Sequence, residues 1–258
     1  MATMLPPPQK ECEHEWGASV EKVPSTCTTV GEAERTCTKC GEKKTEEIPL
    51  HHYVDYKCKD CSAWGKGPAG GYVFYDKGSY SDGWRYLEAA PADLRVVDGK
   101  PTVDSTASGY DNAENRYIFG YYRTSASEKN KAAGTNISIG SGEANTQNLV
   151  EKMGDNAYTY SSGSETTADY AARLCSILEY EHDGVFYTDW FLPSKDELNL
   201  MYENLKKKGI GSFADDNPYY WSSSERAAGY AWKQNFASGY QYDYTRDDDG
   251  HVRPIRAF

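Results

Sequence analysis

The cysteines are distributed very unevenly along the chain, and this constrains the fold more than any other feature. Six of the seven lie between Cys12 and Cys61, and only Cys175 follows a glycine-rich stretch at 65–71. Three segments are predicted: a tether at 1–10, a small Cys/His-rich module at 11–66 and a main domain at 67–258. A domain of about 190 residues can bury a substantial core without crosslinks.

Two CxxC motifs are typical of a zinc-binding module. Cys37 and Cys40 are separated from Cys58 and Cys61 by seventeen residues, and thiolates with imidazoles fill the tetrahedral shell of Zn²⁺. Further donors allow two structural zinc sites, which we predict as Cys12, His14, Cys37 and Cys40 for one and Cys27, His52, Cys58 and Cys61 for the other. A disulfide-stapled module is the open alternative, because six cysteines are an even number and a surface protein meets oxidising conditions.

The net charge of -11 excludes the partners that require a basic surface. Nucleic-acid backbones and anionic membrane surfaces both attract Lys and Arg, so we expect neither as a partner. The sequence contains no run of about 18 apolar residues that could span a bilayer. The 22 tyrosines against 7 phenylalanines place aromatic area where hydroxyl groups can also reach water or a partner, as at binding interfaces.

The main domain carries two helix signals among many short strand signals. Thr166 and Asp169 predict the start of one helix. Ser194 and Glu197 form a capping-box pattern for a second helix, which we expect to end in three lysines and Gly209. Strands are predicted at 71–76, 84–88, 231–236 and 252–258. Two helices among short strands indicate an α+β domain.

No motif in the main domain predicts catalysis, so we expect a protein that is not an enzyme. Cys175 falls on the apolar stripe of the first predicted helix, which indicates a buried and unreactive thiol. The glycines at 140–142 match neither a phosphate-binding loop nor a helix start. The acidic run Asp247–Gly250 lacks the alternate spacing and closing Glu of an EF-hand loop, so no calcium is required.

The C-terminal segment has the composition of a binding surface enclosed by an apolar framework. Between Glu225 and Val252 it is rich in Tyr, Asp, Gly and Ser, as antibody paratopes are. Four motifs resemble those of the Treponema variable proteins that a retroelement diversifies: GWRYLEAA at 83–90, WFLPSKDEL at 190–198, YWSSSE at 220–225 and VRPIRAF at 252–258. The resemblance covers roughly residues 70–258.

That resemblance implies a C-type lectin fold with two helices and short antiparallel strands, related to formylglycine-generating enzymes. Their oxidase chemistry is not carried over, because it uses paired cysteines and the main domain has only Cys175. In this family adenine mutagenesis diversifies codons near the C-terminus, here in a variable region at about 222–258. The ligand-binding variable positions implied are Ala228, Gly229, Tyr230, Ser238, Tyr240, Tyr242, Asp243, Tyr244, Asp247, Asp248, Asp249, Gly250 and His251.

We therefore expect a binding protein with a fixed scaffold and a swappable contact face for protein or other surface ligands. The resemblance implies display on the bacterial cell surface as an outer-membrane lipoprotein, attached only through a lipid anchor outside this chain, and we expect a monomer. The alternative is a carbohydrate-binding, lectin-like module with a fixed tyrosine-rich site, in which the tyrosines stack on sugar rings.

Overall fold

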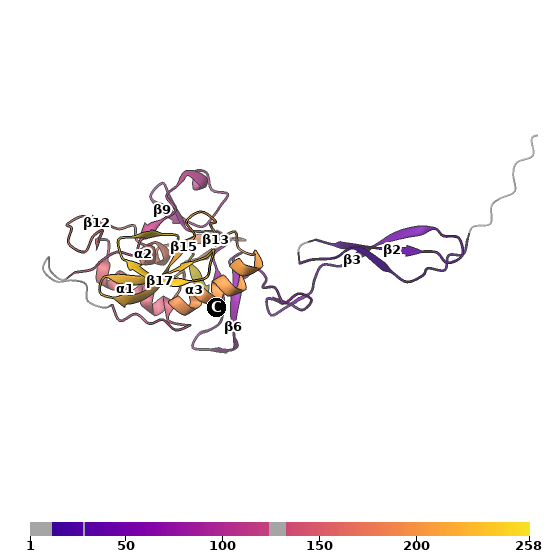
Figure 1. Cartoon of the computed structure of the whole chain (residues 1–258), viewed down its shortest axis with the longest axis horizontal. Helices are drawn as coiled ribbons and strands as arrows, with labels where there is room; N and C mark the ends of the chain where they lie inside the picture. The colour runs from indigo at the N-terminus through magenta and orange to yellow at the C-terminus, as the bar shows by residue number, and fades with distance from the viewer. Residues whose placement is uncertain (1–11, 28, 124–132) are drawn as a thin grey trace, which may run out of the picture. The chain divides into compact units, whose positions relative to one another are not determined.

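The computed structural model describes residues 12–27, 29–123 and 133–258, so the predicted tether lies outside the described residues. The chain divides into two compact units, Met1–Ser62 and Ala63–Phe258, here called the N-terminal unit and the C-terminal unit. Figure 1 labels their main elements. None of the described helices is long and apolar enough to cross a membrane.

The N-terminal unit consists of two small antiparallel sheets with almost no apolar interior. A three-stranded sheet has the order β1-β2-β3, and a hairpin pairs β4 with β5. Their bounds are β1 Val20–Val23, β2 Gly31–Thr36, β3 Lys43–Ile48, β4 Tyr53–Val54 and β5 Lys57–Cys58. Among the described residues of this unit, the buried apolar side chains are Ala33, Cys37 and Cys58. Two of the three belong to the CxxC motifs, so hydrocarbon packing alone does not account for this fold.

The C-terminal unit contains two three-stranded antiparallel sheets. One has the order β15-β16-β17, formed by Tyr219–Ala227, Tyr230–Asn235 and Gln241–Thr245. The other has the order β19-β7-β6, formed by Ile255–Ala257, Trp84–Ala89 and Tyr72–Ser81. The two-stranded ladders are β8 Arg95–Val97 with β9 Lys100–Thr102, β10 Tyr117–Ile118 with β18 Asp249–Gly250, β11 Ala157–Tyr158 with β12 Thr166–Thr167, and β13 Tyr180–His182 with β14 Val185–Tyr187. The four predicted strands correspond to β6, β7, β16 and β19.

Three α-helices accompany these strands: α1 Gly142–Met153, α2 Ala171–Ser176 and α3 Lys195–Asn204. Helix α3 confirms the second predicted helix, because Ser194 Oγ accepts from the Glu197 amide while the Glu197 carboxylate accepts from the Ser194 amide. A 3₁₀ turn, η2 at Lys206–Lys208, and a left-handed Gly209 with φ of 70° end this segment as predicted. A second 3₁₀ turn, η1, spans Tyr110–Asn112.

The first predicted helix is present as α2, with Cys175 on its buried face, but its predicted start is wrong. Thr166 pairs in strand β12 and does not cap a helix, so α2 begins only at Ala171. Helix α1 begins at Gly142, where the sequence predicts no helix. Its buried face includes Asn145 and Thr146, whose side chains are hydrogen-bonded within the protein. Because these buried residues are polar, the sequence of the helix lacks the regular apolar spacing that predicts one.

The predicted α+β class, a C-type lectin fold with two helices, is also wrong for this structure. The described residues form three short α-helices and mostly antiparallel strands, which are divided among eight small sheets. Asp-Gly pairs explain part of this division. At 82–83, 98–99 and 183–184 both residues have positive φ and close a hairpin between neighbouring strands. Each pairing is therefore local and does not extend into one continuous sheet.

Two apolar clusters lie on opposite faces of β15. Tyr220 and Trp221 are consecutive on this strand and fully buried, and each belongs to a different cluster. Phe119 packs edge-on against Trp221 with ring centroids 5.5 Å apart, whereas Phe236 packs against Tyr220 at 4.4 Å. Strand β15 is thus the buried member of its sheet and provides a fixed base for β16 and β17.

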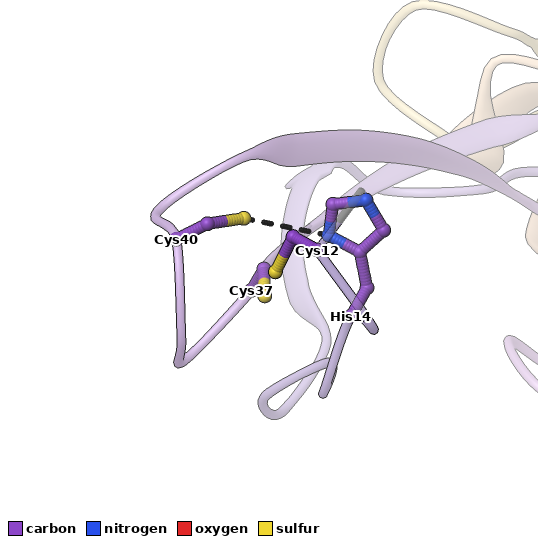
Figure 2. A group of neighbouring side chains, drawn as sticks. All are labelled: Cys12, His14, Cys37 and Cys40. Carbon is purple, nitrogen blue, oxygen red and sulfur yellow. Dashed lines mark hydrogen bonds between the residues drawn. The ribbon is translucent and has the colours of Figure 1, made fainter. Parts of the chain in front are cut away.

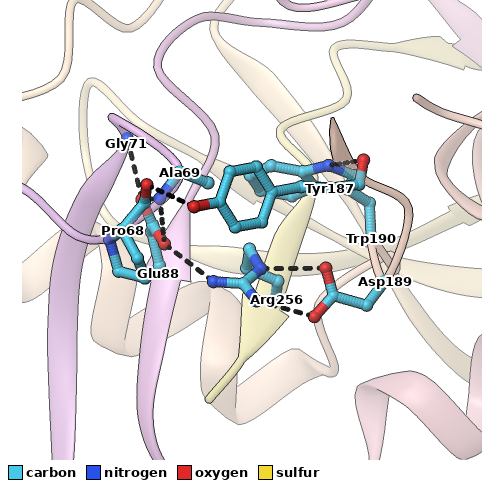
Figure 3. Close-up of polar contacts among 8 residues, drawn as sticks. All are labelled: Pro68, Ala69, Gly71, Glu88, Tyr187, Asp189, Trp190 and Arg256. Carbon is cyan, nitrogen blue, oxygen red and sulfur yellow. Dashed lines mark hydrogen bonds and ion pairs between the residues drawn. The ribbon is translucent and has the colours of Figure 1, made fainter. Parts of the chain in front are cut away.

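A buried ion-pair network ties the start of the C-terminal unit to its last strand (Figure 3). The fully buried Glu88 carboxylate accepts from the amides of Ala69 and Gly71, at 3.1 and 2.8 Å, and lies 3.2 Å from Arg256 Nη1. Arg256 also pairs with Asp189 at 2.8 Å. Burial raises the pKa of Glu88, and its hydrogen-bond donors oppose that shift. Through Glu88 on β7, the network joins the segment before β6 to β19.

Candidate functional site

The β16–β17 hairpin carries many of the predicted ligand-binding residues and divides them between two faces. Its ladder is regular, with Lys233 opposite Tyr242 and Trp232 opposite Asp243. Residues directly opposite one another lie on the same face of a sheet, and neighbours along a strand alternate. Tyr242 therefore shares a face with Lys233, while Asp243 shares the other face with Trp232 and Tyr230. The predicted positions do not form one continuous face.

Four residues form a tyrosine ladder along the first face: Tyr219, Tyr240, Tyr242 and Tyr244. Ring centroids are 6.2 Å apart for Tyr240 and Tyr242, 6.3 Å for Tyr242 and Tyr244, and 5.4 Å for Tyr244 and Tyr219. Tyr240 is 67% exposed and Tyr242 is 45% exposed, whereas Tyr244 packs partly against the core. Burial and the neighbouring Tyr219 hydroxyl raise the pKa of Tyr244 to about 12. The exposed end of the ladder can stack against a ligand and hydrogen-bond to it.

Tyr219 is a ladder residue that the sequence does not single out. It precedes Trp221 by two positions on β15, so strand alternation puts both on one face. This alternation identifies Tyr219 as a ladder residue only when the start of β15 and its pairing with β16 are known. On the other face, Trp232 is half-buried and lies under the Lys195 ammonium group, 4.7 Å from the ring centre.

A buried lysine beneath the ladder fixes the loop that follows β17. Lys233 is 1% exposed; its ammonium group pairs with Asp248 and donates to the Asp249 carbonyl. The same ammonium group lies 4.2 Å from the centre of the Trp221 ring. Burial lowers the pKa of Lys233, and the Asp248 carboxylate opposes that shift. Asp248, a predicted contact residue, therefore has a structural partner.

A second buried pair fixes the far end of the hairpin. Arg246 is fully buried, with Nη1 3.0 Å from Glu225 Oε1 and Nε donating to the Gly120 carbonyl at 2.8 Å. Glu225 also accepts from the Tyr122 hydroxyl and the Ala133 amide, each at 2.7 Å. The backbone of the hairpin is thus held by groups that lie beneath its exposed side chains.

The remaining predicted positions range from exposed to buried. Ala228, Ser238 and Asp249 are exposed, and Gly229 and Asp247 are half-buried. Asp247 accepts a hydrogen bond from the Tyr121 hydroxyl at 3.2 Å. Gly250 and His251 are buried, so the expectation that they belong to the contact face is wrong.

Packing around β15 explains why these two residues are buried. A Cβ atom on Gly250 would lie 3.0 Å from Lys233 Cε and 3.1 Å from Trp221 Cδ1. His251 is 3% exposed, and its ring centroid lies 5.3 Å from that of Tyr220. Burial lowers the pKa of His251. The same histidine lines a cavity of about 450 Å³, together with Asp93, Arg95 and Tyr110 among others.

The first predicted metal group is confirmed as a cluster in the N-terminal unit (Figure 2). Cys37 and Cys40 lie between β2 and β3, and Cys12 and His14 come from the segment before β1. The four ligand atoms all lie within 4.8 Å of one another, and Cys40 Sγ is 3.4 Å from His14 Nδ1. Tetrahedral zinc with bonds of about 2.0–2.3 Å would separate its ligand atoms by roughly 3.5–3.8 Å. The cluster fits such an ion.

The second cluster contains His51 in place of the predicted His52. Its members are Cys27, His51, Cys58 and Cys61, again within 4.8 Å. Cys27 Sγ lies 3.3 Å from Cys61 Sγ and 3.6 Å from His51 Nδ1. The prediction of His52 is wrong, because the imidazole that joins the thiols is that of its neighbour. The His52 amide donates to Asp60 at 2.8 Å.

One thiol in each cluster ionises easily. Burial acts to raise the pKa of Cys37, but hydrogen bonds from His14 and from backbone amides outweigh it and lower that pKa to about 6. Burial likewise opposes the backbone and thiol donors at Cys58, whose pKa falls to about 7. The Cys12 thiol, hydrogen-bonded to Cys40, has its pKa raised to about 11. Thiolates are the forms that bind metals, so the lowered pKa of one thiol in each cluster favours metal binding.

Cys175 is the only cysteine of the C-terminal unit and is fully buried on α2, as predicted. Burial raises its pKa well above the usual value. Such a thiol is not a nucleophile at neutral pH.

Comparison with known proteins assigns the chain to no family. No protein-family model matches it. A search of curated proteins also finds no match. The candidate sites are therefore interpreted from their own geometry.

Proposed function

We propose that the C-terminal unit binds a macromolecular ligand through the exposed end of the tyrosine ladder. The observation that carries this proposal is the position of Tyr240 and Tyr242, exposed on a hairpin whose backbone is held by buried Lys233 and Arg246. Side chains that do not hold the fold can be selected for contact alone. Tyrosine supplies a large, rigid contact area and one hydrogen-bonding group.

We further propose that retroelement mutagenesis diversifies this surface and that the protein is displayed on a bacterial cell. Exposed positions tolerate replacement within about 0.5 kcal/mol, which makes diversification physically feasible there. Sequencing of the locus across clonal derivatives and related isolates tests the idea. Substitutions are expected at Tyr240, Tyr242 and Asp243 and not at Lys233 or Arg246. A hairpin as constant as the rest of the chain contradicts diversification and leaves a fixed binding site.

A fixed carbohydrate site is the competing interpretation, and the ring geometry disfavours it. The Tyr240 and Tyr242 rings are inclined by 57°, and those of Tyr242 and Tyr244 by 78°. Neighbouring rings therefore do not form a flat platform for a sugar chain. Tilted rings suit the irregular surface of a protein partner. Strong binding on a glycan array, with or without calcium, would favour the carbohydrate site.

The binding role predicts that the double variant Tyr240→Ala, Tyr242→Ala loses binding and keeps its stability. The fluorescently labelled chain is titrated onto a panel of bacterial and host cells, and we expect at least a 10-fold loss of affinity. The midpoint of thermal unfolding should hardly move, because both side chains are exposed. Tyr80→Ala is the matched control, since Tyr80 is 71% exposed on β6. Equal binding by the double variant and the control contradicts the proposal.

For the N-terminal unit, we propose that each cluster holds a structural zinc ion. The supporting observation is the composition of the clusters, each with three thiols and one imidazole. Disulfides within such clusters leave one thiol over in each, whereas one tetrahedral zinc uses all four ligands. Elemental analysis of the purified chain should find two zinc ions per molecule. A metal-free protein with paired cysteines favours the disulfide interpretation.

A further inference from the structure

Strand β17 is the outer strand of its sheet in the described part of the chain, where it pairs only with β16. Two backbone hydrogen bonds fix which backbone groups face outward. The Asn235 amide donates to the Tyr240 carbonyl at 2.9 Å, and the Arg246 amide donates to the Gly229 carbonyl at 3.2 Å. Even-numbered residues of β17 therefore pair with β16, because hydrogen-bonded and non-hydrogen-bonded pairs alternate in an antiparallel ladder. The amides of Gln241, Asp243 and Thr245 point to the open edge.

This edge lacks most of the features that usually block the pairing of a further strand, and Asp243 is its one charged residue. Segment 240–245 contains no proline, lysine or arginine, and the β16–β17 ladder contains no bulge. Tyr242, Asp243 and Thr245 are all exposed. The three outward residues Gln241, Asp243 and Thr245 have six backbone groups at the open edge. The Thr245 carbonyl is excluded because it accepts from the Asp248 amide at 3.0 Å, so five groups remain.

Charge favours a basic partner at this edge. Asp243 lies on the edge strand and Asp247 lies in the loop just after it, whereas Asp248 and Asp249 of that loop are paired with Lys233 and Arg116. The one cation of the segment, Arg246, is buried and paired with Glu225. The chain as a whole carries a net charge of -11, which steers cationic partners toward it.

We propose that β17 receives an extended basic peptide segment of the partner as an additional strand, through backbone pairing with Gln241, Asp243 and Thr245. This inference rests on the proposed binding role and names the chemistry of its ligand. Alternate side chains of the added strand lie beside Tyr242 on one face and beside Asp243 on the other, so apolar and basic residues should alternate. Backbone pairing supplies affinity and the side chains supply specificity. Hydrogen bonds between the backbones of β17 and the peptide persist when the side chains of β17 change. Such binding suits the proposed surface, whose residues vary.

The test uses the full chain and the acetylated, amidated peptide VKVKVKV as probe, with binding followed by NMR. We expect a dissociation constant below about 1 mM. The same peptide with every amide N-methylated keeps its side chains and loses its donors, so we expect at least 10-fold weaker binding. The acidic peptide VEVEVEV should also bind at least 10-fold more weakly. Equal binding of the methylated peptide, or no binding of the parent peptide, overturns the proposal.

Variants of Asp243 separate backbone pairing from charge. Asp243→Pro removes an outward amide that the ladder with β16 does not use, and proline is tolerated on edge strands in this orientation. We expect at least a 10-fold loss of peptide affinity, against about 3-fold for Asp243→Asn, which keeps the amide. Thermal unfolding checks that the proline variant is folded; if it is not, the methylated peptide on the natural chain decides. The proposed function and edge pairing can fail separately. If the tyrosine double variant loses cell binding but the N-methylated peptide binds as well as the parent peptide, the proposed function stands and edge pairing is rejected.

Discussion

The two units of the chain reach a defined fold by different means. The C-terminal unit buries large side chains such as Trp221, Tyr220 and Phe74 in two apolar clusters. In the described part of the N-terminal unit, Ala33 and two cysteines are the only buried apolar side chains. A segment of that size cannot bury enough hydrocarbon to offset its conformational entropy, so crosslinks or metals usually supply the difference. The comparison indicates that the cysteine clusters hold the N-terminal unit together, as the apolar clusters do in the C-terminal unit.

Metal removal should break this comparison most strongly. Chelation under reducing conditions is expected to unfold the N-terminal unit and leave the C-terminal unit intact. Zinc binding contributes about 10–16 kcal/mol in small zinc peptides, which exceeds the stability of a unit of this size. Hydrogen exchange read by mass spectrometry distinguishes the two units in one sample. Retained protection of β2 and β3 after chelation would show that the unit has another source of stability.

The C-terminal unit should instead be most sensitive to its buried charges. Glu225→Gln leaves Arg246 buried without a counter-charge, so we expect a loss of about 3–5 kcal/mol in the free energy of unfolding. Glu203→Gln is the matched control, because the pair between Glu203 on α3 and Lys207 on η2 is exposed and should change stability by less than about 0.5 kcal/mol. Chemical denaturation measures both. Similar losses of unfolding free energy in the two variants would contradict the conclusion that the buried Glu225–Arg246 pair matters more than the exposed one.

Two glycines near the hairpin sharpen the contrast between the core and the surface. Gly250→Ala should cost about 1–3 kcal/mol, because the new methyl group meets Trp221 and Lys233 at 3.0–3.1 Å. Gly229→Ala should stay within about 0.5 kcal/mol, since nothing lies within 4 Å of the added atom. Thermal unfolding of the two variants is a direct comparison. Equal midpoints would contradict the burial of Gly250.

The smallest expected effect is a pH dependence that originates at His251. Burial lowers its pKa below the unfolded value of 6.5, so the unfolded chain binds the proton more readily. The stability associated with the neutral ring is present above that pH and is lost as the pH falls through it, by at most about 1.4 kcal/mol per pH unit. The difference in unfolding free energy between the natural chain and His251→Phe, measured from pH 7 to 5, isolates this contribution. Glu88 titrates in both proteins, so its opposite effect cancels. A constant difference contradicts the prediction.

The N-terminal clusters were predictable from spacing only in part. CxxC turns present two thiols to one point whatever the surrounding fold, so Cys37 with Cys40 and Cys58 with Cys61 could be paired from spacing. Spacing does not decide which motif receives Cys12, His14 and Cys27, although the predicted division agrees with the clusters. Adjacent histidines cannot be distinguished in this way. The fold brings the His51 imidazole to Cys27, Cys58 and Cys61, and this tertiary arrangement is not readable from spacing.

In the C-terminal unit one of the two local capping signals was correct, and patterns that depend on packing were not readable. The Ser194–Glu197 capping box is complete within one turn, so it could be read directly. Helix α1 was missed because Asn145 and Thr146 are buried through hydrogen bonds to other segments. Composition likewise identified the exposed Tyr240 and Tyr242 but could not exclude His251, whose burial depends on its packing against Tyr220.

The alternation of side chains along β17 has a consequence for how this segment can evolve. Codons 240, 242 and 244 specify the ladder, whereas codons 241, 243 and 245 specify the opposite side of the same ribbon. Point changes in one set leave the other chemically untouched, while an insertion of one codon exchanges the two. A short stretch of DNA therefore encodes two patches that can change separately. Substitutions within it are tolerated, whereas the number of codons must stay the same.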